Sequence, residues 1–170
     1  LNKLASNAPQ IINSPAKTYI QLGIGHIALG FDHLLFVLGL FILFSRKRTL
    51  LIAVTSFTLG HSLTLGLATL GWVQLRAAPV EFLIAVSLVL LGREILLQTP
   101  TQPSSLLRSP WLIPGVFGLV HGLGFAGALN QLGLAQGTIV ETLLFFNLGV
   151  ELGQLCFILV LIFLYWALSP

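Results

Sequence analysis

All four histidines of this chain lie in apolar stretches, and two acidic residues occupy similar surroundings. Imidazole and carboxylate groups are typical ligands of Ni(II), Co(II), Zn(II) and Fe(II). Cu(I) prefers sulfur ligands, and the chain has no Met and a single Cys. We therefore predict a site for a divalent transition-metal ion. Its candidate ligands are His26, Asp32, His33, His61, His121 and Glu151.

The composition indicates that the elements carrying these residues lie in a membrane. Of the 170 residues, 56% are hydrophobic and 8% are charged, and the mean hydropathy is +0.98. Soluble domains carry about 25% charged residues, so the lipid bilayer is an expected partner of this chain. A formal net charge of +3, with only eight basic residues, excludes a nucleic-acid surface. The lone Cys156 excludes a disulfide within one chain.

The apolar stretches predict an all-α integral membrane protein, a bundle of five to six transmembrane helices. A helix needs roughly 20 apolar residues to cross the hydrocarbon core. The first and last stretches are longer than this, and a break in the last one would give six elements. Residues 1–17 are predicted as an extramembrane N-terminal arm, and residues 18–170 as a single transmembrane domain. The predicted spans are Thr18–Phe44, Thr49–Gly71, Val80–Gln98, Trp111–Leu129 and Thr138–Leu168.

The basic residues predict the orientation of the bundle, because cytoplasmic loops are rich in Lys and Arg. Arg46, Lys47 and Arg48 follow the first span, and Arg93 and Arg108 flank the third loop. We therefore expect the N-terminus outside and, with five spans, the C-terminus in the cytoplasm. The missing initiator Met fits a mature chain that has lost a signal peptide, or a trimmed sequence.

Five of the candidate ligands share one depth in the membrane. Each lies within two positions of the midpoint of its predicted span, which corresponds to about 3 Å of depth. An ionisable group at the bilayer centre costs roughly 2.5–3.5 kcal/mol. Mutual pairing or a shared cation would remove this cost, so we expect the side chains to meet. The five are Asp32, His33, His61, His121 and Glu151.

The spacing of His26 and His33 is harder to reconcile with one ion. Seven residues separate them, so they share a helix face but differ by about 10.5 Å along the axis. Either Gly30 lets the helix bend, or His26 belongs to a second station nearer the outside. Asp32 is turned by about 100° from His33. It could bind the ion from another direction or orient an imidazole ring.

Further polar residues are predicted to orient the ligands or to line a pathway. Three of them form a stripe on the last span, with spacings of four and then three residues. Two hydroxyl residues flank His61. The stripe is Asn147, Glu151 and Gln154, and the hydroxyl residues are Ser62 and Thr64.

Pairs of glycines four residues apart surround both His121 and Glu151. Such pairs let the backbones of membrane helices approach closely. We therefore expect the fourth and fifth spans to bring His121 and Glu151 towards each other. The glycines are Gly118, Gly122, Gly149 and Gly153.

The segment from His26 to His33 has the pattern His-x5-Asp-His. It resembles the signature of the HupE/UreJ family of hydrogenase- and urease-associated nickel permeases. Three further stretches are similar to other blocks of that family, and together the matches cover most of the chain between His26 and Gln154. These stretches are Phe57–Thr64, Gly118–Phe125 and Phe146–Gln154.

The chain resembles the second, less characterised branch of this family. The permeases have a motif with two histidines and a closing glutamate around a His-Gly pair. Here His121 and Gly122 match that pair, but Phe117 and Gly124 stand where the first His and the Glu would be. The resemblance implies a small multi-pass helical protein of the bacterial cytoplasmic (inner) membrane. It also implies uptake of nickel or cobalt, with the first-span His and Asp required, and it leaves a homo-oligomer open.

Three functions fit these residues. The leading interpretation is a divalent transition-metal (nickel/cobalt-like) permease, in which His26 captures the ion outside and passes it to the deeper ligands. An alternative is an intramembrane zinc-type metalloenzyme, a hydrolase with Glu151 as general base and Ser62 or Asn147 as oxyanion partner. A third is a structural or sensory subunit held together by metal. We expect a transporter rather than an enzyme, so no catalytic residue is assigned.

Overall fold

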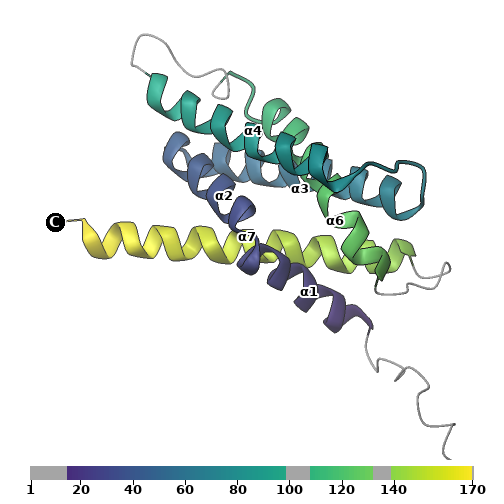
Figure 1. Cartoon of the computed structure of the whole chain (residues 1–170). Helices are drawn as coiled ribbons and strands as arrows, with labels where there is room; N and C mark the ends of the chain where they lie inside the picture. The colour runs from purple at the N-terminus through teal and green to yellow at the C-terminus, as the bar shows by residue number, and fades with distance from the viewer. Residues whose placement is uncertain (1–14, 99–107, 132–138, 170) are drawn as a thin grey trace, which may run out of the picture.

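The computed structural model describes residues 15–98, 108–131 and 139–169, which form six helices and no strand. The predicted all-α fold is confirmed for this part of the chain. Residues 1–14 of the predicted arm lie outside the described residues. The helices are α1 (Pro15–Leu29), α2 (Phe31–Leu43), α3 (Lys47–Thr69), α4 (Ala77–Leu97), α6 (Leu112–Gln131) and α7 (Ile139–Leu168) (Figure 1).

The first predicted span is broken at Gly30. Helix α1 ends at Leu29, α2 begins at Phe31, and the two helices are bent by 73°. Gly30 has an extended backbone, and a Cβ atom there would lie 2.7 Å from the carbonyl oxygen of His26, closer than real Cβ atoms come. The bend that we considered for the spacing of His26 and His33 is therefore present.

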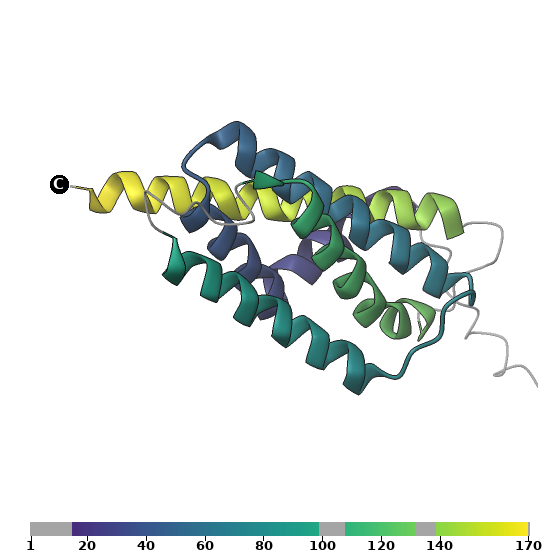
Figure 2. The same cartoon turned by 90° about the horizontal axis from the view of Figure 1, so that it is seen from above.

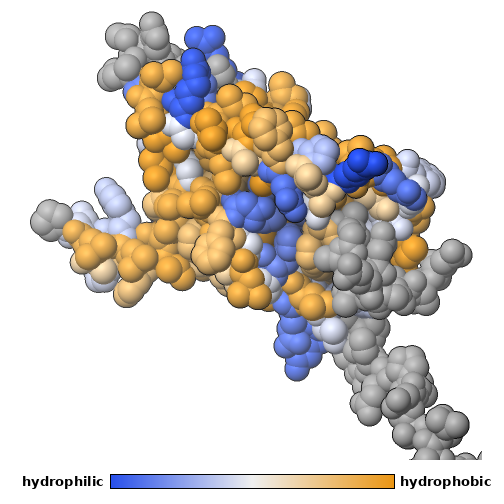
Figure 3. Space-filling model, in the orientation of Figure 1, coloured by the Kyte–Doolittle hydropathy of each residue, from blue (hydrophilic) through white to orange (hydrophobic). Residues whose placement is uncertain are grey.

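The last predicted span is one unbroken helix. Helix α7 runs for 30 residues, and its C-terminal end projects beyond the other helices (Figures 1 and 2). The sixth helix therefore comes from the break at Gly30 and not from a break in the last span. Hydrophobic residues cover this projecting end and most of the face seen in Figure 3, as expected of a surface in contact with lipid.

Length and composition allow fewer full crossings than the five predicted spans. In the described residues, α3 and α7 are long and apolar enough to cross a membrane, and the bent pair of α1 and α2 adds a third if it is one span. Helix α4 carries Glu81, Arg93 and Glu94 among its 21 residues. In α6, the segment Leu112–Phe125 is apolar over the residues whose side chains are described. The charged residues of α4 thus separate it from the other spans.

Two helix pairs form the most extensive contacts, α3 with α6 and α1 with α7. In the first pair, a Cβ atom at Gly118 would collide with the carbonyl oxygen of Phe57. In the second pair, a Cβ atom at Gly149 would collide with the carbonyl oxygen of Ile20. Each glycine pair therefore packs against a different helix, and the expected approach of the fourth span to the fifth through these glycines is wrong. Helix α6 instead lies between α3 and α4 (Figure 2).

Two hydrophobic clusters meet where the histidines are gathered. The larger cluster draws on α2, α3, α4 and α7 and includes Phe57, and the smaller one includes Phe146. The ring of His33 contacts Phe57 and the ring of His26 contacts Phe146. The polar centre therefore lies between two apolar clusters, where buried polar atoms without a partner are costly.

Candidate metal centre

The four histidines converge from four different helices, with His33 in the middle. The ring centroid of His33 lies 4.6 Å from that of His26, 5.8 Å from that of His61 and 5.1 Å from that of His121. The exposed fractions of His33, His61 and His121 are 3%, 0% and 1%. The bend at Gly30 allows this convergence, because it turns α1 relative to α2 so that the ring of His26 reaches the ring of His33.

These side chains form two groups that could each hold a metal ion. One group is His26, His33 and His61, and the other is Asp32, His33 and His121; within each, the ligand atoms all lie within 4.8 Å of one another. His33 belongs to both. Among the described residues, every such group contains His33. The structure thus places five of the six predicted ligands together.

Asp32 orients the ring of His33. The Nδ1 atom of His33 and the Oδ1 atom of Asp32 are 3.0 Å apart. Because a carboxylate can only accept, Nδ1 carries the proton, and Nε2 of the neutral imidazole keeps its lone pair. This Nε2 atom is buried and has no hydrogen-bond partner in the described part of the chain. A carboxylate that holds a histidine in this way is common beside metal ions.

Asn147 orients the ring of His61 by the same logic. The Nδ2 atom of Asn147 donates to the carbonyl oxygen of Leu143 at 2.8 Å, and its Oδ1 atom lies 3.4 Å from Nδ1 of His61. The amide oxygen therefore accepts the Nδ1 proton, and the lone pair of His61 is on Nε2. That atom is also buried without a partner among the described residues.

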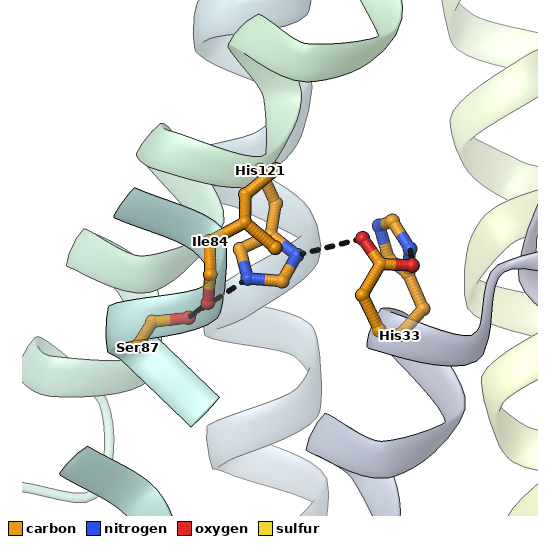
Figure 4. A network of polar contacts seen from close by, with 5 residues as sticks. His33, Ile84, Ser87 and His121 are labelled. Atoms are coloured by element: carbon orange, nitrogen blue, oxygen red, sulfur yellow. Dashed lines mark hydrogen bonds and ion pairs between the residues drawn. The ribbon is translucent and has the colours of Figure 1, made fainter. Parts of the chain in front are cut away.

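Ser87 orients the ring of His121 from the opposite side. Its hydroxyl donates to the carbonyl oxygen of Ile84 at 2.7 Å and lies 3.1 Å from Nε2 of His121. A hydroxyl has one proton, so Ser87 accepts from Nε2, and the lone pair of His121 is on Nδ1. Nδ1 lies 3.9 Å from Oδ2 of Asp32. Figure 4 shows the His121 ring between Ser87 and His33.

Aromatic rings enclose the centre. Phe125 and Phe146 are stacked with centroids 5.0 Å apart, and both contact His26, at 4.1 and 5.6 Å. Phe57 contacts the other three histidines, with centroid distances of 5.9, 6.3 and 5.1 Å. These rings help to bury His33, His61 and His121, whereas 34% of the Asp32 side chain is exposed. Electrostatic interactions are stronger in buried surroundings than in solution.

Glu151 is the one predicted ligand that joins neither group. Its Oε1 atom accepts a hydrogen bond of 2.6 Å from Thr55 on α3. Gln154, which is fully buried, accepts a bond of 2.8 Å from Thr58 through Oε1. Together with the contact between Asn147 and α3, all three residues of the predicted stripe connect α7 to α3.

The two hydroxyl residues beside His61 bind the backbone of their own helix. Ser62 donates to the carbonyl oxygen of Thr58 at 2.6 Å, and Thr64 donates to that of Gly60 at 3.3 Å. Both are ordinary back-bonds of hydroxyl residues within a helix.

Ser87 is a residue of this centre that sequence reasoning missed. It is the only polar residue between Glu81 and Arg93, and it is buried, with 2% of its surface exposed. A single hydroxyl in the middle of an apolar helix was the available signal, because such a group needs a partner in the membrane. The role of Phe57 left no such signal, since the chain has 12 Phe residues in similar surroundings.

The donors suit a divalent cation of intermediate softness. The groups contain imidazole nitrogens and one carboxylate, and Cys156 is exposed and belongs to neither. Such ligands favour Ni(II), Co(II), Zn(II) or Fe(II) over Cu(I). With three side chains in each group, an ion would retain open coordination positions, which permit exchange.

Comparison with known proteins gives one match. No curated protein and no solved structure matches the chain. The family described as HupE / UreJ protein matches residues 3–170, which is essentially the whole chain. This is a membrane family related to nickel and cobalt transport, in keeping with the apolar helices and the His/Asp groups. The chain therefore belongs to the HupE/UreJ family.

Proposed function

We propose that this protein is a permease for a divalent transition-metal ion, with nickel or cobalt as the cargo. His26, His33 and His61 bind the ion through their Nε2 atoms. Two observations support this proposal. Each of the three rings offers a nitrogen within 4.8 Å of those of the other two, and the Nε2 atoms of all three are buried without a hydrogen-bond partner in the described residues.

The cost of such unpaired atoms favours an ion as their missing partner. A buried polar atom without a hydrogen bond costs roughly 1–3 kcal/mol. Asp32 and Asn147 hold two of the rings so that the lone pairs of His33 and His61 stay free. A purely structural role would be served better by pairing these nitrogens, as the hydroxyl of Thr58 is paired with Oε1 of Gln154 between α3 and α7. Nε2 of Gln154 also lacks a partner in the described residues, but Gln154 belongs to neither ligand group.

Three neutral nitrogens also suit transport. A carrier must release its cargo, and three imidazoles hold a dication less tightly than a closed shell with several anionic ligands does. Family membership favours nickel or cobalt over the other cations of similar chemistry. The cargo then crosses the bacterial inner membrane through a multi-pass bundle, with the basic residues Arg46, Lys47 and Arg48 on the cytoplasmic side.

The geometry gives the hydrolase less support. Its general base would be Glu151, whose carboxylate is bound by Thr55 on the edge between α3 and α7. Its oxyanion partners would be Ser62 and Asn147. The hydroxyl of Ser62 is used on a carbonyl group, and the amide of Asn147 donates to Leu143.

The test is uptake of radioactive nickel and cobalt into proteoliposomes that contain the purified protein. The wild type should accumulate the ion, and elemental analysis should find bound metal. His33→Ala should abolish both, because His33 is common to both ligand groups.

Thr142→Val is a matched control. Thr142 is a buried residue of α7 whose hydroxyl has no partner in the described residues, and it belongs to neither ligand group. It should keep wild-type uptake. Folded wild-type protein that binds neither nickel nor cobalt would refute the proposed function.

A further inference from the structure

We propose that Asp32, His33 and His121 form a second ion station next to the histidine station of His26, His33 and His61. In this proposal, His33 passes the ion from one station to the other. The inference rests on the proposed function and adds an internal transfer step to it.

The second station is indicated by two acceptors that face each other with no proton between them. Ser87 fixes the lone pair of His121 on Nδ1, and this atom lies 3.9 Å from the Oδ2 atom of Asp32. Nδ1 is buried and has no hydrogen-bond partner among the residues described. Metal–ligand bonds of about 2.0–2.2 Å put two ligands of one ion at most about 4.4 Å apart. A cation therefore fits between these atoms.

The two stations are joined at one side chain. His33 is the only residue common to both groups of ligands. Its Nδ1 atom faces Asp32, and its Nε2 atom is free on the other side of the ring. A neutral imidazole offers one lone pair at a time, so His33 serves the first station through Nε2 while its proton is on Nδ1. It serves the second station through Nδ1 once that proton has moved to Nε2. The stations therefore hold one ion between them.

The surroundings give the transfer an aromatic border and a direction. The ring of Phe57 contacts His61 of the first station, His121 of the second and His33 between them. One aromatic side chain thus borders the whole path. The first station has three neutral ligands, and the second includes the carboxylate of Asp32, which attracts a dication. Transfer towards His121 is therefore favourable.

Cobalt provides the probe, because its visible absorption reports the ligands around Co(II). Wild-type protein in detergent should bind one cobalt ion per chain. The double variant His26→Ala/His61→Ala should still bind one, at the second station and with a changed spectrum. Addition of His121→Ala to this variant should abolish binding, whereas His121→Ala alone should keep one ion at the first station.

Uptake should separate binding from transfer. Both His121→Ala and the double variant should lower the rate of cobalt uptake about tenfold or more, at least the effect of removing a residue that only orients a metal ligand. The matching His→Asn variants repeat the series with polar side chains in case the alanine proteins fail to fold. Unchanged elution in size-exclusion chromatography and unchanged helicity establish folding.

The outcomes distinguish this inference from the proposed function. Wild-type protein without cobalt binding or uptake would remove the permease itself. If the wild type transports, then wild-type uptake by His121→Ala, or no binding by the folded double variant, would overturn the second station alone. Two cobalt ions on one wild-type chain would overturn the single shared ion.

Discussion

Two polar regions lie in apolar surroundings in this protein, and they differ in how their hydrogen bonds are completed. Between α3 and α7, Thr55 binds Glu151 and Thr58 binds Oε1 of Gln154, so that only Nε2 of Gln154 among these polar atoms is buried without a partner in the described residues. Around His33, in contrast, four histidines each leave a buried nitrogen without a partner in the described residues. Paired groups hold helices together, whereas unpaired groups at close range call for a ligand. Sequence position alone did not distinguish the two regions.

The largest expected effect comes from His33→Ala, which removes the ligand common to both groups. Metal binding and uptake should fall by about 100-fold or more, at the upper end of effects seen at metal sites. Equilibrium dialysis with radioactive nickel measures the binding. If the variant keeps the wild-type affinity, the ion binds elsewhere, and the unpaired nitrogens around His33 are not its ligands.

A change at Gly30 tests whether the bend assembles the centre. In Gly30→Ala, the new Cβ would lie 2.7 Å from the carbonyl oxygen of His26 and 3.0 Å from Nδ1 of His33. We expect a loss of about 1–3 kcal/mol in stability, as for other overpacked sites, and weaker metal binding. Thermal unfolding and dialysis measure both. Gly25→Ala is the matched control, because a Cβ at Gly25 would meet nothing within 4 Å.

The residues that orient the histidines should have intermediate effects. Asn147→Leu removes the acceptor of the His61 Nδ1 proton, so the lone pair is no longer fixed on Nε2. We expect metal affinity to fall about tenfold, with one ion still bound per chain. Isothermal titration with cobalt provides the measurement. An unchanged affinity would show that this contact only holds α7 to α3, like its neighbours in the stripe.

The smallest effect is expected in the paired region. Glu151→Gln keeps an acceptor for Thr55 and should leave metal affinity within about twofold of the wild type. Stability should change by about 0.6 kcal/mol, typical of a hydrogen bond between membrane helices. Equilibrium dialysis measures the metal affinity, and thermal unfolding measures the stability. A loss of binding as large as in His33→Ala would move Glu151 back among the ligands.

Much of the candidate centre could be anticipated from depth. Ionisable side chains near the middle of apolar spans are too costly to remain apart, and this predicted that His33, His61 and His121 would meet. Asp32 was anticipated both as a ligand and as the residue that orients an imidazole. Depth gave no information about direction around each helix axis, so Glu151 was grouped with these residues although it lies on the edge facing Thr55.

The sequence by itself determined the class of protein and the chemistry available to it. Composition requires a membrane, and the side chains closest to mid-span that can bind a transition metal are imidazoles and carboxylates. Family motifs were also legible, because they are local strings of residues. Both conclusions depend on residue identity and need no knowledge of contacts.

Only the tertiary structure decided which polar atoms are satisfied and which are free. The bend at Gly30, the packing of Gly118 on α3 rather than α7, and the contact between Ser87 and His121 arise from how whole helices fit together. Hydrogen bonding acts over about 3 Å, so a small rotation of a helix turns a ligand into a structural pair. Residue spacing along one chain does not encode that rotation.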